Sequence, residues 1–270
     1  MLDVGIVGCG AIGTILARFI AEDARGLRLV SVFDRHIDSS ERLTSSLTPQ
    51  PTIEDVPQMA EHVDIIIECA STSAVPEVAR TALSNGCQVM IMSVGALTDP
   101  ELKDELVELA EKHGTRIHIP SGAIVGIDGL KAAGIVGIDQ VVLKTKKNPK
   151  NLKDAPYTKK NRINLNSINK ETLIFAGTAR EATTAFPANI NVAATLSLAG
   201  IGSEKTSVEI YADPSLTRNV HEILVKGSFG TFTTTVENVP SPKNPRTSYL
   251  AALSAIATLK EMTDPLQIGT

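Results

Sequence analysis

The chain of 270 residues contains no tryptophan, three tyrosines and six phenylalanines, so its core must be mainly aliphatic. Its three cysteines, Cys9, Cys69 and Cys87, include no C-x-x-C pair. This excludes a disulfide framework and indicates a reducing compartment. No apolar run reaches the ~20 residues of a membrane helix, and no basic segment precedes the first apolar run, as a signal peptide would require. These absences predict a cytoplasmic globular protein.

Two further absences narrow the chemistry. Neither H-E-x-x-H nor paired cysteines occur, so we expect no metal site. No G-x-S-x-G elbow occurs either, which excludes one common class of serine hydrolase. The net charge of −4 argues against nucleic acid as a binding partner. A basic stretch does run from Lys144 to Arg162. We interpret it as a solvated loop, with a positive field for an anionic substrate as the alternative.

The first 120 residues alternate between apolar runs and amphipathic segments. Helices are predicted around residues 12–20, over 75–83, and after Asp99-Pro100, where Asp99 can cap the helix. Apolar runs predict strands at residues 2–7, 27–33, 63–69, 88–92 and 116–119. Continuous apolar strands alternating with helices are typical of a parallel sheet covered on both faces. The fold class is therefore α/β, with an N-terminal Rossmann domain that is a doubly wound parallel sheet.

The second half has a different pattern. Strand-like runs at residues 141–147, 173–177, 208–212, 220–226 and 229–236 predict a mostly antiparallel sheet. Gly227-Ser228 is the predicted hairpin turn, and helices are predicted near 190–200 and 247–261. We therefore expect a dinucleotide-binding domain at residues 1–122 and a C-terminal α+β domain at 123–245. The second domain would serve substrate binding, catalysis and oligomerisation, and the final helix, about 246–262, would pack back on the first.

The first turn carries the motif Gly8-x-Gly10-x-x-Gly13 between a strand and a helix. Gly8 permits the tight turn, Gly10 lets the backbone approach a pyrophosphate, and Gly13 lets the helix lie close to the strand. The helix start, with Ala11 and Ile12, supplies free amides for the phosphates. The motif predicts a dinucleotide site, and the alternative is a glycine turn that binds nothing.

An acid at the end of the second strand bears on which dinucleotide binds. Asp34 lies twenty-one residues after Gly13, where an acid can accept both ribose hydroxyls and disfavours a 2′-phosphate. This favours NAD. Arg35 and His36 follow at once and could bind a 2′-phosphate, so NADP stays open. Ala70 and Ser71 follow a strand at its carboxyl end and are predicted to approach the cofactor, with an ordinary loop as the alternative.

His221 is the histidine of most interest. It shares one strand face with Ile223 and Val225, so it points toward an interior or a cleft. Its two interpretations are an acid–base group and a buried imidazole bonded to a backbone carbonyl. Asn189 and Asn191 precede an apolar helix, where an amide can cap the helix or bind a carboxylate or carboxamide.

Many short blocks, in one order, resemble a known family. They are 8–13, Glu68-Cys69-Ala70, 93–97, 120–124, 127–128, 177–182, 186–187, 191–196, 212–214, Asn219-Val220-His221, 227–230 and 244–248. The chain resembles the L-aspartate dehydrogenases of the NAD-biosynthesis type. The resemblance implies oxidation of L-aspartate with NAD or NADP to iminoaspartate, which hydrolyses to oxaloacetate and ammonia.

The resemblance also implies roles for single residues. His221 would be the active-site residue, and Ala123 and Asn191 would bind NAD. The substrate carboxylates need cationic or polar partners, for which the candidates are Arg180, Asn189, Lys147, Arg246, Thr247 and Ser248. A homodimer is expected. Two rival hypotheses are a Rossmann reductase of the dihydrodipicolinate or homoserine type, and a non-catalytic NAD-sensing module.

Overall fold

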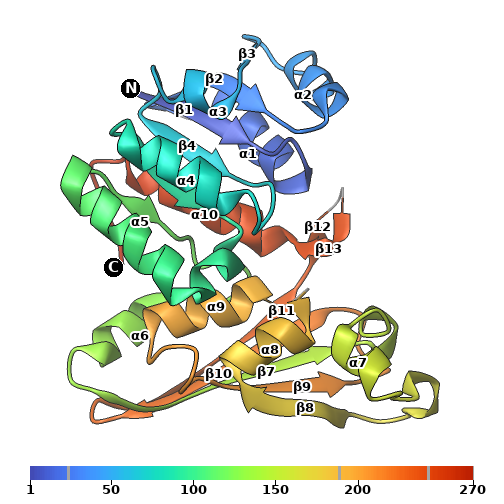
Figure 1. Ribbon diagram of the computed structural model, residues 1–270. Helices are drawn as coiled ribbons and strands as arrows, with labels where there is room; N and C mark the ends of the chain where they lie inside the picture. The colour runs from blue at the N-terminus through green and yellow to red at the C-terminus, as the bar shows by residue number, and fades with distance from the viewer. Residues whose placement is uncertain (23–24, 188–189, 242–243, 270) are drawn as a thin grey trace. The chain divides into compact units, whose positions relative to one another are not determined.

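The computed structural model describes residues 1–22, 25–187, 190–241 and 244–269 (Figure 1). They form two compact units, each with its own core. Unit 1 comprises Met1–Gly122 with Ala251–Ile268, and unit 2 is formed mainly by Ala123–Leu250. Over the ranges given above, no helix combines the length and apolar character needed to cross a bilayer.

Unit 1 is built on a six-stranded parallel sheet in the order β3-β2-β1-β4-β5-β6. The predicted doubly wound parallel sheet is thereby confirmed. The strand order reverses between β1 and β4, and ligands of such sheets bind beyond the carboxyl ends of the strands at this point. The strands are β1 (Leu2–Val7), β2 (Leu27–Phe33), β3 (Thr52–Ile53), β4 (Ile65–Glu68), β5 (Gln88–Ile91) and β6 (Ile117–His118).

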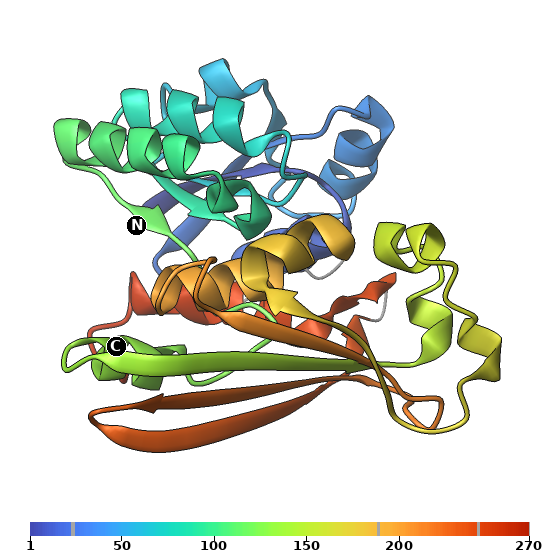
Figure 2. The ribbon, with the colours of Figure 1, turned by 60° about the horizontal axis from the view of Figure 1, so that its bottom comes forward.

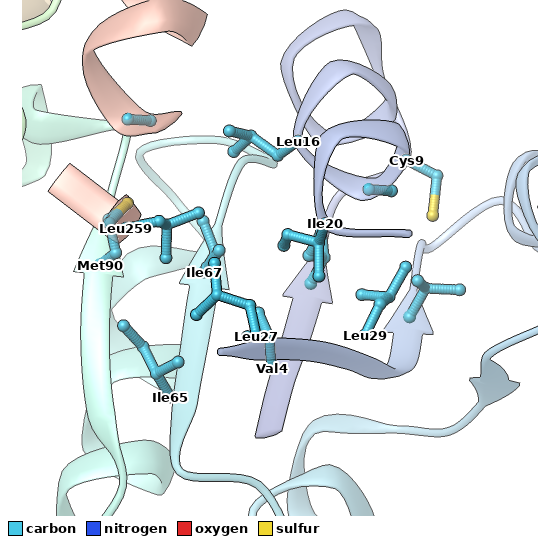
Figure 3. Close-up of a cluster of buried hydrophobic side chains, with 14 of the residues drawn as sticks. Val4, Cys9, Leu16, Ile20, Leu27, Leu29, Ile65, Ile67, Met90 and Leu259 are labelled. Atoms are coloured by element: carbon cyan, nitrogen blue, oxygen red, sulfur yellow. The ribbon is translucent and has the colours of Figure 1, made fainter. Parts of the chain in front are cut away.

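Helices cover both faces of this sheet, as continuous apolar strands require. On one face, Leu16 and Ile20 of the first helix and Leu259 of the last helix pack with Val4 and Ile67 in an aliphatic core (Figure 3). Helices α4 and α5 pack together over the other face (Figure 1). The helices are α1 (Ala11–Glu22), α2 (Ile37–Thr44), α3 (Val56–Met59), α4 (Val75–Ser84), η1 (Val94–Thr98), α5 (Pro100–His113) and α10 (Tyr249–Glu261).

Unit 2 is built on a five-stranded sheet in the order β11-β10-β7-β9-β8. Its pairs are antiparallel except β7–β9, which is parallel, so the mostly antiparallel sheet is confirmed. Two short strands, β12 (Pro240–Ser241) and β13 (Asn244–Ser248), pair separately. The main strands are β7 (Ile138–Lys147), β8 (Thr172–Thr178), β9 (Ser207–Ala212), β10 (Asn219–Gly227) and β11 (Gly230–Asn238).

Helices of unit 2 pack on one face of this sheet (Figure 2). Leu130, Ala182 and Leu196 contribute to that core from three different helices. They pack with alternate strand residues such as Leu143 and Ile223, which project to the same side. The helices are α6 (Ile127–Gly134), η2 (Pro149–Asn151), α7 (Pro156–Lys160), η3 (Leu165–Ser167), α8 (Ala179–Ala185) and α9 (Ile190–Ala199).

The predicted hairpin turn at Gly227-Ser228 is wrong by one residue. Gly227 pairs with Gly230, so the two-residue loop is Ser228-Phe229. Gly227 is needed for another reason: a Cβ there would lie 2.4 Å from the carbonyl oxygen of Gly137. The glycine therefore permits close strand approach, and Gly230, with φ of 121°, takes the unusual backbone conformation.

Side-chain caps define the start of two helices. Asp99 accepts hydrogen bonds from the backbone N–H groups of Glu101 and Leu102, as predicted. Helix α8 was not predicted, although its start carries a recognisable signal. Thr178 and Glu181 form a reciprocal capping box, the pattern in which a threonine is followed three residues later by a glutamate.

Replacing Asp99 with alanine should lower the free energy of unfolding by about 1 kcal/mol, because two amides at the start of α5 lose their acceptor. Urea unfolding measures this. Asp104→Ala in the same helix, where the side chain is 65% exposed, should change stability by less than about 0.5 kcal/mol. Equal losses in both variants would rule out the cap as the cause.

Candidate active site

The glycine turn between β1 and α1 is closely packed at Gly8 and Gly13 and open at Gly10. A Cβ on Gly8 would lie 2.6 Å from the carbonyl carbon of Cys69, and one on Gly13 would lie 1.9 Å from the carbonyl oxygen of Gly8. At Gly10, by contrast, no described residue beyond its two chain neighbours would have a heavy atom within 4 Å of an added Cβ. The backbone thus forms an open cradle at the amino end of α1, which fits a pyrophosphate in contact with the turn.

Asp34 lies directly after β2 and braces this turn. Its Oδ2 accepts a hydrogen bond from the backbone N–H of Cys9 at 2.8 Å, and its Oδ1 accepts one from the N–H of His36 at 2.9 Å. A carboxylate has about four acceptor positions, so two remain for the hydroxyls of a ribose. The side chain is half-buried, whereas Arg35 and His36 are exposed. Asp34 therefore fits the ribose end of a dinucleotide.

Glu68 is a buried carboxylate that sequence reasoning did not single out. Its Oε1 accepts hydrogen bonds from the N–H groups of Ala70 and Ser71 at 2.8 and 3.0 Å. Ser93, after β5, donates its N–H to Oε2 and its hydroxyl to Oε1, both at 2.9 Å. Burial raises the pKa of Glu68, and these four donors oppose that shift. The carboxylate thus fixes two loops at the carboxyl edge of the sheet, including the predicted cofactor residues Ala70 and Ser71.

A second polar cluster lies on sheet β11-β10-β7-β9-β8 of unit 2. His221 on β10 is 5% exposed and lies opposite Thr145 on β7. The Nδ1 of His221 is 3.0 Å from the hydroxyl of Thr145. Burial, with a smaller contribution from the Lys147 charge, lowers the pKa of His221 to about 3. The imidazole is therefore neutral near pH 7, in the form that accepts a proton.

Lys147 ends β7 on the same face as Thr145, two residues away. It is 8% exposed, and burial lowers its pKa to about 8, which leaves the ammonium mostly charged at neutral pH. Its neighbours in the basic stretch differ, because Lys144 pairs with Glu209 and Lys146 pairs with Glu171 and Glu222. The stretch is thus neither a uniform solvated loop nor a uniform basic patch.

The other candidate residues have diverse environments. Ala123 accepts a hydrogen bond from Asn238 through its carbonyl oxygen, and the hydroxyl of Ser248 donates to the same Asn238. Asn191, in the first turn of α9, is exposed. Arg180 is exposed and already paired with Glu204. Asn189 lies outside the described residues, and Arg246 and Thr247 are described only as backbone positions of β13.

Comparison with known proteins connects both units to one family. Residues 128–262 match the family model described as aspartate dehydrogenase, C-terminal. The L-aspartate dehydrogenases of Methanococcoides burtonii and Nitrosopumilus maritimus are 52% and 45% identical to this chain, with all of both chains covered. The chain belongs to the aspartate dehydrogenase family. The crystal structure of aspartate dehydrogenase from Thermotoga maritima superposes with a TM-score of 0.80 at 28% identity, covering 100% of both chains.

Family membership also separates the rival hypotheses. Residues 8–120 match the family model described as the NAD-binding domain of homoserine dehydrogenase. The C-terminal match, which includes Lys147 and His221, is to the aspartate dehydrogenase model and not to a model of another reductase. The recognition made from short sequence blocks is confirmed.

The cradle predicts opposite consequences for two glycines. Gly10→Ala should leave the melting temperature unchanged, because among the described residues only the two chain neighbours lie near the added methyl group. It should weaken NAD binding by about tenfold or more, or ~1.4 kcal/mol, because the methyl group occupies the space above the turn. Gly13→Ala should lower stability by about 1–3 kcal/mol, because its methyl group overlaps the Gly8 carbonyl. Thermal unfolding and calorimetric titration with NAD measure both effects. Full NAD affinity in Gly10→Ala would contradict this assignment of the cradle.

Glu68→Gln should lower the free energy of unfolding by about 1–3 kcal/mol, since an amide cannot accept all four hydrogen bonds at a buried position. Denaturant unfolding measures the loss. The control is Glu108→Gln on the exposed side of α5, which should change stability by less than about 0.5 kcal/mol. A Glu68→Gln variant as stable as the control would show that Glu68 does not hold the loops.

Proposed function

We propose that this protein is an NAD(P)-dependent L-aspartate dehydrogenase. It oxidises L-aspartate to iminoaspartate, which water converts to oxaloacetate and ammonia. The observation that carries the proposal is the 52% identity, over the whole of both chains, to the L-aspartate dehydrogenase of Methanococcoides burtonii. The open cradle above Gly10 and the buried neutral imidazole of His221 support it.

The reaction divides between the two described groups of residues. The nicotinamide cofactor, when bound, accepts the hydride that leaves the α-carbon of the substrate. The turn at Gly8–Gly13 and Asp34 would hold the dinucleotide by its phosphates and ribose. His221 would accept the proton that leaves the substrate amino group. The hydride carries two electrons and one proton, so the substrate loses two electrons and two protons in all. Its hydrogen bond to Thr145 fixes the ring, and proton transfer to a positioned base is efficient.

The residues around the ribose position favour NAD over NADP. Asp34 directs its carboxylate to the turn through two backbone amides, and a carboxylate there repels a 2′-phosphate. Arg35 and His36 are exposed beside it, and they are the groups through which NADP would bind. We therefore propose NAD as the preferred cofactor and NADP as a second one.

Three finer features stay predictions. A role in NAD biosynthesis, in which the imine would be used before it hydrolyses, is what the family resemblance implies. A cytoplasmic location is supported by the three free cysteines, two of them buried. A homodimer is supported by the family resemblance and by a mostly antiparallel sheet whose helices pack on one face.

The proposed function is tested by mixing the purified protein with L-aspartate and NAD and following the absorbance of the reduced cofactor. Turnover with L-aspartate should exceed turnover with L-glutamate or L-alanine, and NAD should give a higher kcat/KM than NADP. Absence of reduced cofactor with L-aspartate and either dinucleotide would exclude the proposed reaction.

His221→Gln should lower kcat by about a hundredfold or more, because general acid–base catalysis is lost. Glutamine keeps a polar group for Thr145, and the NAD affinity should stay within about twofold of wild type. His113→Gln is the control, because His113 is exposed at the end of α5, and it should keep wild-type turnover. Unchanged kcat in His221→Gln would remove the imidazole from the mechanism.

A further inference from the structure

The buried charge of Lys147 is unusual for an interior position. The residue is 8% exposed, and over residues 1–22, 25–187, 190–241 and 244–269 no carboxylate pairs with its ammonium. Burial is the one cause of its lowered pKa. An unpaired buried charge destabilises a fold, so its presence indicates an anion that binds during function.

Asn219 supplies a complementary group on the neighbouring strand. Its Oδ1 is buried without a hydrogen-bond partner among the described residues. Asn219 lies two residues from His221 on β10, and Lys147 lies two residues from Thr145 on β7. His221 and Thr145 are opposite each other in an antiparallel register, so Lys147 and Asn219 share their face, one pleat further along both strands.

This face therefore carries the ammonium of Lys147, the acceptor oxygen of Asn219 and the neutral imidazole of His221. The α-carbon of an amino acid carries a carboxylate and an amino group. The carboxylate complements the ammonium of Lys147, and the amino group, a hydrogen-bond donor, complements the oxygen of Asn219. We propose that Lys147 binds the α-carboxylate of the substrate and that Asn219 Oδ1 accepts a hydrogen bond from its amino group, next to His221. The inference rests on the proposed function and deepens it, because it separates recognition of the head group from recognition of the side-chain carboxylate.

Pairing at Lys147 also has a consequence for His221. The Lys147 charge disfavours a proton on the imidazole of the free protein, and it contributes to the lowered pKa of His221. A bound carboxylate offsets that charge. Substrate binding would thus raise the proton affinity of His221 when a proton must leave the amino group.

The roles of the two carboxylates of aspartate can be tested separately with two ligands, each of which has one carboxylate replaced by an amide. L-Asparagine keeps the α-carboxylate, and L-isoasparagine, the α-amide, keeps only the side-chain carboxylate. Isothermal titration into wild-type protein and Lys147→Met should show about thirtyfold or greater weakening for L-aspartate and L-asparagine in the variant. Binding of L-isoasparagine should change by less than about twofold.

Two further variants make the test independent of folding and of the neighbouring charge. Lys147→Met should not lower the melting temperature, since it replaces an unpaired buried charge with an apolar side chain. Lys146→Met, which removes a lysine paired on the opposite face, should leave all three affinities unchanged. Asn219→Ala should weaken all three ligands by a similar factor, because each keeps its amino group.

The outcomes separate this inference from the proposed function. If wild-type protein turns over L-aspartate but Lys147→Met binds L-asparagine as wild type does, the inference is wrong and the function stands. Weakening confined to L-isoasparagine would assign Lys147 to the side-chain carboxylate and overturn the inference. If wild-type protein binds L-asparagine through Lys147 but does not oxidise L-aspartate, the head-group site stands and the proposed function fails.

Discussion

Close backbone approach at the turn after β1 is the constraint on which unit 1 depends. Gly8 lies against the loop that follows β4, and α1 begins so close to the turn that Gly13 cannot carry a side chain. This contact brings together the two strands at which the sheet order reverses. The buried carboxylate of Glu68 then links the loop after β4 to the loop after β5. The cradle for a dinucleotide is thus a product of packing between three strand ends.

Unit 2 meets a different constraint, because its sheet buries polar groups among aliphatic ones. Ile223 and Val225 continue the face of His221 into the core, and this apolar surrounding keeps the imidazole neutral. The same surrounding lowers the pKa of Lys147 to about 8, so the ammonium stays mostly charged at neutral pH, and no carboxylate of the described residues pairs with it. Burial thus lowers the pKa of both groups, and their different ordinary values separate them: the imidazole is neutral near pH 7, whereas the ammonium keeps most of its charge.

Much of this molecule could be predicted from local sequence patterns. The strand and helix periods, the glycine turn, the Asp99 cap and the face on which His221 lies each depend on residues close together in the chain. The hairpin turn was misplaced because Gly227 was interpreted as a turn residue, although close contact with Gly137, the residue before β7, requires a glycine there. Helix α8 was missed because it is short, and seven residues carry little periodicity.

The sequence by itself determined the two-part architecture, the dinucleotide motif and, through many short blocks in one order, membership of the aspartate dehydrogenase family. Only the tertiary structure decided which charged side chains form ion pairs and which are buried without one. Lys146 and Lys147 are adjacent in sequence, yet strand alternation directs one toward carboxylates and the other into the interior. Likewise, Glu68 and Ser93 meet although twenty-five residues separate them. Ion pairs and burial depend on which strands become neighbours, and that information is not local in the chain.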